Sequence, residues 1–212
     1  EIAQRLAHEI KTPLSTVMLS AQRLQVEYEK DPDKKRGRYL DRILRQVERL
    51  QTMTDAFMKF ARIEAPRLEK TDVNTLIQNW LEDNRSLIGG AVRGQTKFAP
   101  DLPGVEIDRQ QIEVVLQNLV SNALAAMEGE GILTISTRLI QNLDTEAIMN
   151  RTGSVQLEIM DTGCGMAEED LQKLFRPFFS RSPGGTGLGL VLSRKIVEDH
   201  AGSIDVRSEE NV

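Results

Sequence analysis

The stretch from Val155 to Val197 decides the fold, and it reads VQLEIMDTGCGM (155–166), EEDLQKLFRPFFSRS (168–182) and PGGTGLGLVLSRKIV (183–197). The residues before the first glycine pair alternate like a strand, and those after the second cluster have helical spacing. Glycines at such junctions allow positive φ and a close approach to a ligand. A helix that starts near Thr186 would direct unpaired N–H groups at that ligand, which suits phosphate. The stretch therefore predicts a site for a phosphorylated ligand.

Composition limits the classes of protein that fit this chain. Its 212 residues are 40% hydrophobic and 28% charged, with a formal net charge of −5, as expected for one or two globular domains. The acidic balance, without a block of Lys and Arg, argues against nucleic acid as a partner. The single cysteine, Cys164, excludes an internal disulfide and a cysteine-based zinc site, and it fits a reducing cytoplasm. Neither a P-loop nor a dinucleotide-binding fingerprint occurs.

The two ends of the chain indicate a fragment. The sequence begins Glu-Ile-Ala without a Met, in the middle of a helical pattern, and no apolar run is long enough to cross a bilayer. We therefore expect a cytoplasmic fragment. The full-length protein has room upstream for a sensor or for an anchor in the inner membrane.

Residues 1–64 predict an antiparallel helical hairpin. Apolar side chains recur every three or four residues from Ile2 to Tyr28 and again within 39–64, and the polar turn 30–37 separates the two runs. Pro13 should kink the first helix. A lone hairpin cannot cover both sides of its apolar seam, so we expect a homodimer that forms a four-helix bundle.

Residues 65–71 are the predicted linker, because Pro66 ends the second helix, and residues 72–212 mix helices with strands. Asp72 is the predicted N-cap of a helix to about Leu87, and Asp108 that of a helix through Met127. Extended segments are predicted at 95–99, 104–107, 132–140, 154–160 and 203–206. This mostly antiparallel pattern favours a two-layer α/β sandwich, so the fold class of the chain is α+β.

His8 lies on the outer face of the first helix, roughly 160° from the centre of the seam at about 100° per residue. Glu9 is beside it and Thr12 follows one turn later. The helix phase excludes a core histidine, and no second His or Cys stands at metal-ligand spacing. A solvated surface histidine is one interpretation. The other is a nucleophile, because a carboxylate that accepts one ring N–H leaves the second nitrogen with a free lone pair.

Five motifs then resemble, in order, those of the sensor histidine kinases of two-component signalling. They are LAHEIKTP (6–13) for the phospho-acceptor H-box, QNLVSNA (117–123) for the N-box, DTGCGM (161–166) for the first glycine box, LFRPFFS (174–180) for the F-box and GTGLGL (185–190) for the second glycine box. The PFFS phrase and the short lid resemble the nitrogen-regulation branch. The resemblance implies a dimerisation and histidine-phosphotransfer hairpin, followed by a GHKL-type ATP-binding domain that lacks its closing strand.

The resemblance also implies a role for each matching residue. Asp161 would accept the adenine amino group, although a carboxylate there could instead cap the next turn. Asn118 and Asn122, one helical turn apart, would offer amide oxygens to Mg²⁺. Close backbone approach and N–H donors to the phosphates of ATP are implied for Gly163, Gly165, Gly185, Thr186, Gly187, Leu188 and Gly189.

The implied function is an ATP-dependent protein histidine kinase that phosphorylates His8 with help from Glu9. It would then pass the phosphoryl group to an aspartate of a response regulator receiver domain. The HExxT pattern that ends at Thr12 further implies phosphatase activity toward that regulator. Two alternatives stay open. A GHKL-type ATPase that drives a conformational change normally has a glutamate where Asn118 stands, and an inactive dimeric scaffold would show a broken motif.

Overall fold

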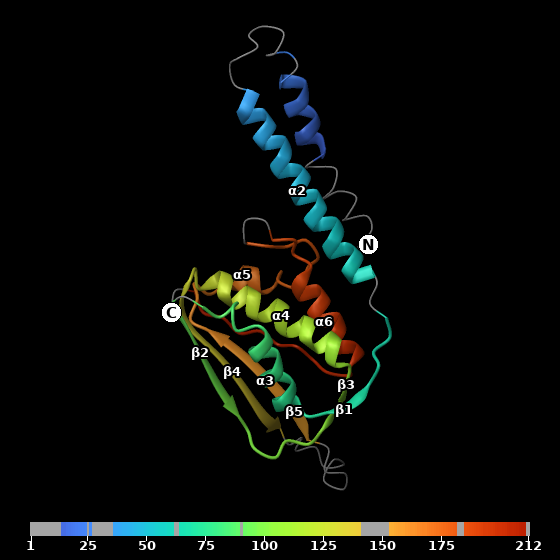
Figure 1. Ribbon diagram of the computed structural model, residues 1–212, viewed down its shortest axis with the longest axis vertical. Helices are drawn as coiled ribbons and strands as arrows, with labels where there is room; N and C mark the ends of the chain where they lie inside the picture. Colours follow the sequence, from blue (N-terminus) through green and yellow to red (C-terminus); the bar gives the residue numbers. More distant parts are fainter. Residues whose placement is uncertain are drawn as a thin grey trace. The chain divides into compact units, whose positions relative to one another are not determined.

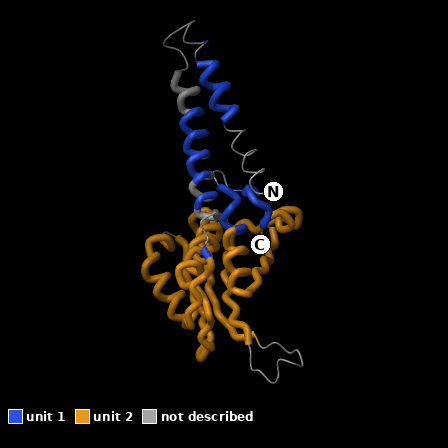
Figure 2. The backbone as a smooth tube through the Cα atoms, turned by 90° about the vertical axis from the view of Figure 1, so that its right-hand side faces the viewer, with its two compact units in different colours: residues 1–64, 174–191 blue, residues 65–173, 192–212 orange. Residues whose placement is uncertain are grey.

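The computed structural model describes residues 14–24, 26, 36–61, 64–89, 91–140, 153–181 and 185–210. The chain divides into two compact units (Figure 2). One comprises residues 1–64 and 174–191, and the other comprises residues 65–173 and 192–212.

The helices of the first unit agree with the apolar periodicity. Residues 14–24 are helical, and α2 runs from Arg36 to Ala61. The predicted helices over 1–28 and 39–64 are confirmed over residues 14–24 and 39–61. Helix α2 begins earlier than predicted, inside the predicted turn 30–37, and Glu64 is not helical. Residues 1–13, which include Pro13 and the kink predicted there, lie outside the described residues. None of the described helices combines the length and apolar character that a bilayer crossing needs.

The second unit is built on a three-stranded sheet in the order β2 (Ala91–Phe98), β4 (Glu130–Ile140) and β5 (Ser154–Asp161) (Figure 1). The central strand β4 runs antiparallel to β5 but parallel to β2. The mostly antiparallel sheet that we predict is thus wrong for the β2–β4 pair. The chain passes through a third strand and a helix between these two strands, and such a crossover lets both run in one direction.

A separate antiparallel pair joins β1 (Glu69–Thr71) to β3 (Val105–Ile107). The pair places the segment that follows α2 beside the residues that lead into the helix beginning at Arg109. The predicted linker, residues 65–71, therefore contains a strand at its C-terminal end.

Two helices of this unit begin at the predicted caps. Asp72 accepts the Thr75 N–H at 2.9 Å before α3 (Val73–Asp83), and Asp108 accepts the Gln111 N–H at 3.1 Å before α4 (Arg109–Ala126). Helix α3 ends earlier than we predict, because both the backbone N–H and the side-chain amide of Asn84 bond to the Trp80 carbonyl and close the last turn. The short α5 (Glu168–Leu171) and α6 (Gly189–Asp199) follow β5.

The core lies between α3, α4 and the sheet, which confirms the two-layer α/β sandwich. Helical spacing buries one face of each helix, and alternation along β4 buries every second side chain of the strand. The most deeply buried apolar residues of this cluster are Ile77, Leu116, Val120, Leu133 and Ile135.

The predicted strand over 203–206 is wrong, because residues 202–209 have no regular structure. This segment is held by a side-chain hydrogen bond that is not part of a β-sheet: the Ser208 hydroxyl accepts the Met166 N–H at 2.9 Å. Strand β2, by contrast, is longer than the extended segment predicted at 95–99, because it begins at Ala91.

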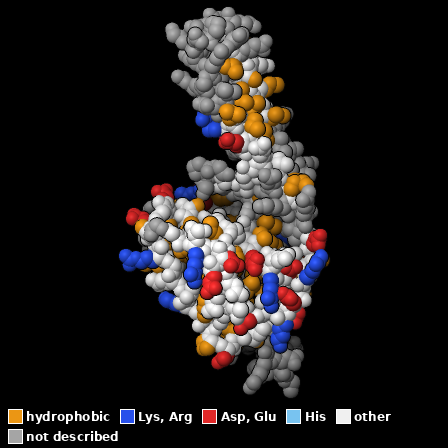
Figure 3. Space-filling view, viewed as in Figure 1, with side chains coloured by type: hydrophobic (Ala, Val, Ile, Leu, Met, Phe, Trp, Pro, Cys, Tyr) orange, Lys and Arg blue, Asp and Glu red, His pale blue; other side chains and the backbone are white. Residues whose placement is uncertain are grey.

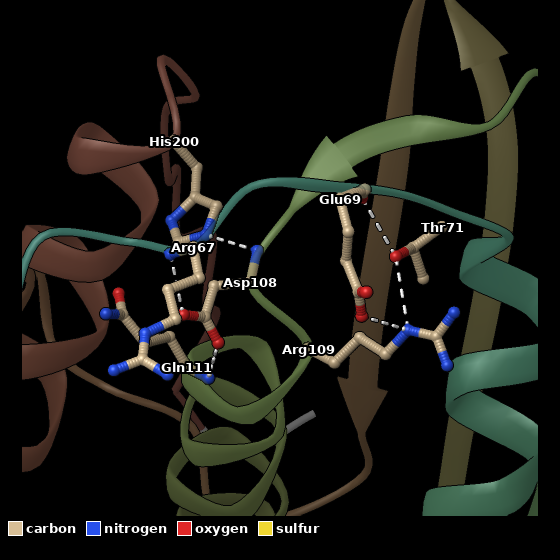
Figure 4. A network of polar contacts seen from close by, with 7 residues as sticks. All are labelled: Arg67, Glu69, Thr71, Asp108, Arg109, Gln111 and His200. Carbon is tan, nitrogen blue, oxygen red and sulfur yellow. Dashed lines mark hydrogen bonds and ion pairs between the residues drawn. The ribbon is translucent and has the colours of Figure 1, made fainter.

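A polar network ties the segment after α2 to the start of α4 and the end of α6 (Figure 4). The Arg67 N–H donates to Asp108 Oδ2 at 2.9 Å, and the Asp108 N–H donates to Nε2 of His200, also at 2.9 Å. Nδ1 of His200 lies 2.7 Å from the Ile196 carbonyl oxygen. Because Nε2 is the acceptor, the His200 proton sits on Nδ1 and is donated to that carbonyl. His200 thus has a structural role here.

An ion pair lies alongside this network. Arg109 Nε is 2.7 Å from Glu69 Oε1 and 3.3 Å from Thr71 Oγ1, so the first residue of α4 holds β1 in place (Figure 4). Together with the Arg67 contact, this pair anchors the C-terminal part of the predicted linker to the second unit.

The pKa of the Asp108 carboxyl predicts an acid-dependent stability. Burial raises this pKa, but hydrogen bonds from the backbone N–H groups of Arg67, Gln111 and Gln110 outweigh burial and hold it below its ordinary value. The resulting stabilisation is fully present above the unfolded-state pKa of about 4 and is lost as the pH falls through the lower folded-state pKa.

We expect Asp108→Ala to lower the free energy of unfolding at pH 7 by about 1–2 kcal/mol, the usual cost of losing an N-cap. The difference between wild type and variant should shrink below pH 4. Urea unfolding between pH 7 and pH 3 measures it. Asp72→Ala, which removes one capping bond from α3, is the matched control. A difference for Asp108→Ala that stays constant down to pH 3 would contradict this account.

Candidate active site

Helix α4 presents the two asparagines of the candidate site on one face. Another face of the helix is fixed in the core by Leu116, Val120 and Ala123. Asn118 and Asn122 are four residues apart and therefore lie one above the other. Asn118 is half-buried, whereas Asn122 is exposed. The Asn118 amide nitrogen donates to the hydroxyl of Ser193 on α6 at 3.3 Å.

Asp161 ends β5, and its carboxylate holds the turn that follows. Oδ1 accepts the N–H of Gly163 at 2.9 Å, while the side chain itself is exposed. The turn-capping interpretation of Asp161 is thus confirmed as a contact. The cap uses one carboxylate oxygen, so it is compatible with a second hydrogen bond from a ligand to the other oxygen.

The first glycine box lies against the C-terminal end of α4. The Cys164 N–H donates to the Ala126 carbonyl at 3.1 Å, and a Cβ added at Gly163 would come within 2.7 Å of Ala126. The structure therefore packs the turn after Asp161 against the C-terminal end of the helix that carries Asn118 and Asn122.

Gly165 is required by the backbone itself. Its φ is +67°, in the left-handed region that favours glycine. An added Cβ would lie 1.9 Å from the carbonyl oxygen of Glu209, which leaves no room for a side chain. The sequence predicts close approach to a ligand at this position, and the structure adds close approach to residues 208–210.

The second glycine box belongs, with the F-box, to the other compact unit. The Phe178 N–H donates to the Gly187 carbonyl at 3.0 Å. Gly187 has φ +64°, and an added Cβ would lie 2.4–2.6 Å from backbone atoms of Phe178 and Phe179. Phe178 itself has φ +65°, an uncommon value for a residue with a side chain. Gly187 thus permits the two boxes to pack backbone against backbone.

The segment around Gly187 leads directly into α6. Gly185 is exposed and Thr186 is half-buried. The Leu188 N–H faces the Thr186 hydroxyl at 3.4 Å, and the helix begins at Gly189. The helix thus starts slightly later than the predicted start near Thr186. The backbone N–H groups that we expect to meet phosphate lie just before the helix or in its first turn.

The whole H-box (6–13) lies outside the described residues. The roles of its candidate residues His8, Glu9 and Thr12 therefore stay predictions.

Three contacts near the site escape sequence reasoning. Ser193 accepts from Asn118, Ser208 accepts from Met166, and Thr162 Oγ1 accepts the Ile132 N–H at 3.0 Å. Only Ser193 carries a sequence signal, because it is a polar residue at a core position of an otherwise apolar helix face. The other two depend on partners 30 or more residues away.

The metal ligands predicted at this site are the side-chain amide oxygens of two asparagines on α4. No three His, Cys, Asp or Glu side chains gather among the described residues as a metal centre would require. The amides of Asn118 and Asn122 remain, and neutral oxygen ligands of this kind suit Mg²⁺, which keeps most of its waters and binds through phosphate oxygens. The donor set therefore fits a nucleotide-bound magnesium ion and does not fit a zinc centre.

A sheet covered by helices, with the turn after Asp161 packed against the helix that carries Asn118 and Asn122, is the arrangement expected of an ATP-binding domain of the kinase and gyrase type. Comparison with known families supports this class. Residues 107–212 match the family described as "Histidine kinase-, DNA gyrase B-, and HSP90-like ATPase", and residues 1–66 match the "His Kinase A (phospho-acceptor) domain". The chain belongs to the sensor histidine kinases of two-component signalling.

Individual relatives agree with this assignment. The chain is 31% identical to nitrogen regulation protein NtrY of Azorhizobium caulinodans over 97% of its length, and 31% identical to sensory histidine kinase/phosphatase NtrB of Vibrio alginolyticus over 98%. It spans 26% of the former and 58% of the latter. Among solved structures, histidine kinase ThkA in complex with response regulator protein TrrA matches 95% of this chain and 55% of that chain, with a TM-score of 0.60 and 26% identity.

Proposed function

We propose that the protein transfers the γ-phosphoryl group of ATP to His8 and then to an aspartate of a response regulator receiver domain. The observation that carries the nucleotide part is the contact of the first glycine box with the end of α4. This contact packs the turn after Asp161, a carboxylate suited to adenine, against the helix whose Asn118 and Asn122 amides suit a magnesium–phosphate group, and so supports the proposal. The phospho-acceptor match over residues 1–66 supports the transfer part.

The residues of the chain have separate roles in this scheme. One ring nitrogen of His8 attacks the γ-phosphorus, the bond to the bridging oxygen of ADP breaks, and the proton of the other ring nitrogen passes to Glu9. Asn118 and Asn122 would hold the metal, whose charge offsets that of the phosphates when it is bound. Transfer of this type needs little covalent help from the protein, so positioning accounts for most of the catalysis.

Asn118 also bears on the alternative functions. Water-activating ATPases need a basic group near the γ-phosphate, and an amide whose nitrogen donates to Ser193 has no basic lone pair to offer. The site residues of the nucleotide motifs are intact in the sequence, which favours an active kinase over a scaffold.

A labelling experiment separates the three functions. With ATP labelled in the γ-phosphate and Mg²⁺, a kinase acquires label in a bond that is labile in acid and stable in base. The label should then pass to an added receiver protein. An ATPase would release labelled phosphate without retaining it, and a scaffold would do neither. Either result would contradict the proposal.

Thr12 is proposed to serve dephosphorylation of the receiver, because it lies one turn from His8 on the same predicted face. Its hydroxyl could hold a water in line with the partner's aspartyl phosphate. Thr12→Ala should keep self-phosphorylation and forward transfer, while the phosphorylated receiver decays more slowly in its presence. Thr12→Ser, which keeps the hydroxyl, is the control. If decay is unchanged in Thr12→Ala, the residue is structural only.

The helices of the first unit support the homodimer that we propose. Large apolar side chains stay exposed on them, and Figure 3 shows such side chains gathered on this part of the molecule. They include Leu14, Met18, Leu19, Leu44, Val47 and Met58. An exposed apolar stripe of this kind marks an interaction surface.

Leu44→Asp should shift the chain from dimer to monomer in sedimentation equilibrium. Leu87→Asp, at an exposed site of the second unit, should not.

A further inference from the structure

Ser193 is a buried polar side chain without a role in the scheme above. It has 0% exposure, and its neighbours Leu192 and Ile196 on α6 are buried apolar residues. A hydroxyl in such a place costs stability unless it is hydrogen-bonded. The described partner is the Asn118 side-chain amide at 3.3 Å. The contact joins residues 75 positions apart in the sequence and connects α4 to α6.

This hydrogen bond is one contact that orients the Asn118 amide. Nδ2 is the donor, so the planar group is turned with its nitrogen toward α6 and its oxygen away from it. The neighbouring Asn122 differs: within the described part of the chain its amide has no hydrogen-bond partner, and the side chain is exposed. One asparagine of the pair is therefore held in orientation by the protein, and the other is not.

We propose that Ser193 is a positioning residue that keeps the Asn118 amide oxygen turned toward the metal ion bound with the nucleotide. The proposal rests on the proposed function, in which Asn118 is a metal ligand. Without the hydroxyl, the amide loses this contact, and orientations that present its NH₂ group, which cannot bind a cation, become more populated. The pre-ordered amide saves the ordering cost at the moment of binding.

The alternative is that Ser193 only contributes to packing between α4 and α6. In that case its removal changes the stability of the fold and affects nucleotide affinity equally with and without metal. The two accounts therefore differ in one quantity: the ratio of the ADP dissociation constants measured in EDTA and in Mg²⁺.

We expect Ser193→Ala to lower that ratio about threefold to tenfold, the scale of one positioning hydrogen bond. The dissociation constant for ADP in EDTA should stay within about twofold of wild type. Calorimetry gives both constants, and a titration of Mn²⁺ into the ADP complex, followed by electron paramagnetic resonance, gives metal affinity directly. Ser193→Cys has nearly the same volume but a weak hydrogen-bonding group, so it tests the same point if the alanine variant does not fold.

Two further variants separate the possible failures. Ser121→Ala is the matched control, because it removes an exposed hydroxyl that accepts from Gln117 on the same helix at 2.9 Å, and its metal dependence should equal wild type. Asn118→Ala tests the underlying assignment. If Asn118→Ala leaves the EDTA-to-Mg²⁺ ratio unchanged, the metal role in the proposed function is wrong. If Asn118→Ala lowers the ratio but Ser193→Ala and Ser193→Cys do not, the positioning role of Ser193 is overturned.

Discussion

His8→Gln should reduce the incorporation of γ-phosphate into the chain to background. Glutamine has a similar reach and is polar, but its amide nitrogen carries no nucleophilic lone pair, so no phosphoramidate can form. The measurement is the acid-labile, base-stable label after incubation with Mg-ATP. Because His8 lies in the H-box and the nucleotide residues lie in the second half of the chain, the affinity for ATP should be unchanged. Normal incorporation in this variant would overturn the assignment of His8.

Glu9→Gln is the companion variant for the same reaction. A glutamine cannot take the imidazole proton, so phosphorylation should slow by about 10²-fold, the scale of losing a general base. ATP affinity should again match wild type. A variant that loses ATP affinity in proportion to its rate would place Glu9 at the nucleotide instead of at the histidine.

Asp161→Asn should weaken ATP binding by about 10- to 100-fold while leaving the fold intact. The asparagine oxygen can still accept the Gly163 N–H that Asp161 accepts at 2.9 Å, and Asn is as suitable as Asp for such a turn. Its NH₂ group would then take the place of the second carboxylate oxygen and face the adenine amino group, donor against donor. The lost hydrogen bond to a charged group is worth roughly 1.5–3 kcal/mol, which sets the expected range.

The base preference provides a sharper measurement than affinity alone. Guanine presents a carbonyl oxygen where adenine presents its amino group, so an amide NH₂ at position 161 should favour guanine. We therefore expect the ratio of ATP to GTP affinity, measured by calorimetry, to fall in Asp161→Asn. Asp72→Asn is the control, since it alters another carboxylate that accepts a backbone N–H. An unaltered preference and affinity in Asp161→Asn would mean that this carboxylate only caps its turn.

Much of the fold could be read from the sequence, because the signals are local. Asp72 and Asp108 each cap a helix through an N–H three residues ahead, so both helix starts follow from neighbouring residues. The extended segments predicted at 132–140 and 154–160 correspond to β4 and β5, because alternation along a strand is a local pattern. The order of the five motifs likewise identifies the family without any three-dimensional information.

The errors fall where a local pattern does not determine the partner. The spacing of residues 203–206 is that of a strand, but a strand forms only if a neighbour offers its hydrogen-bonding edge, and these residues have no regular structure. Helix α3 stops at Asp83, where both the backbone N–H and the side-chain amide of Asn84 bond to the Trp80 carbonyl.

By itself, the sequence determined the two kinds of domain, their order, the caps of two helices and the residues to inspect for nucleotide binding. These features depend on spacings of a few residues, which the chain carries in every conformation. The tertiary structure alone decided the parallel pairing of β2 with β4, the hydrogen bond between Asp108 and His200 across 92 residues, and the hydrogen bond between Asn118 and Ser193 across 75. Such contacts join residues that have no relation along the chain. Their geometry exists only after the core between α3, α4 and the sheet has brought them together.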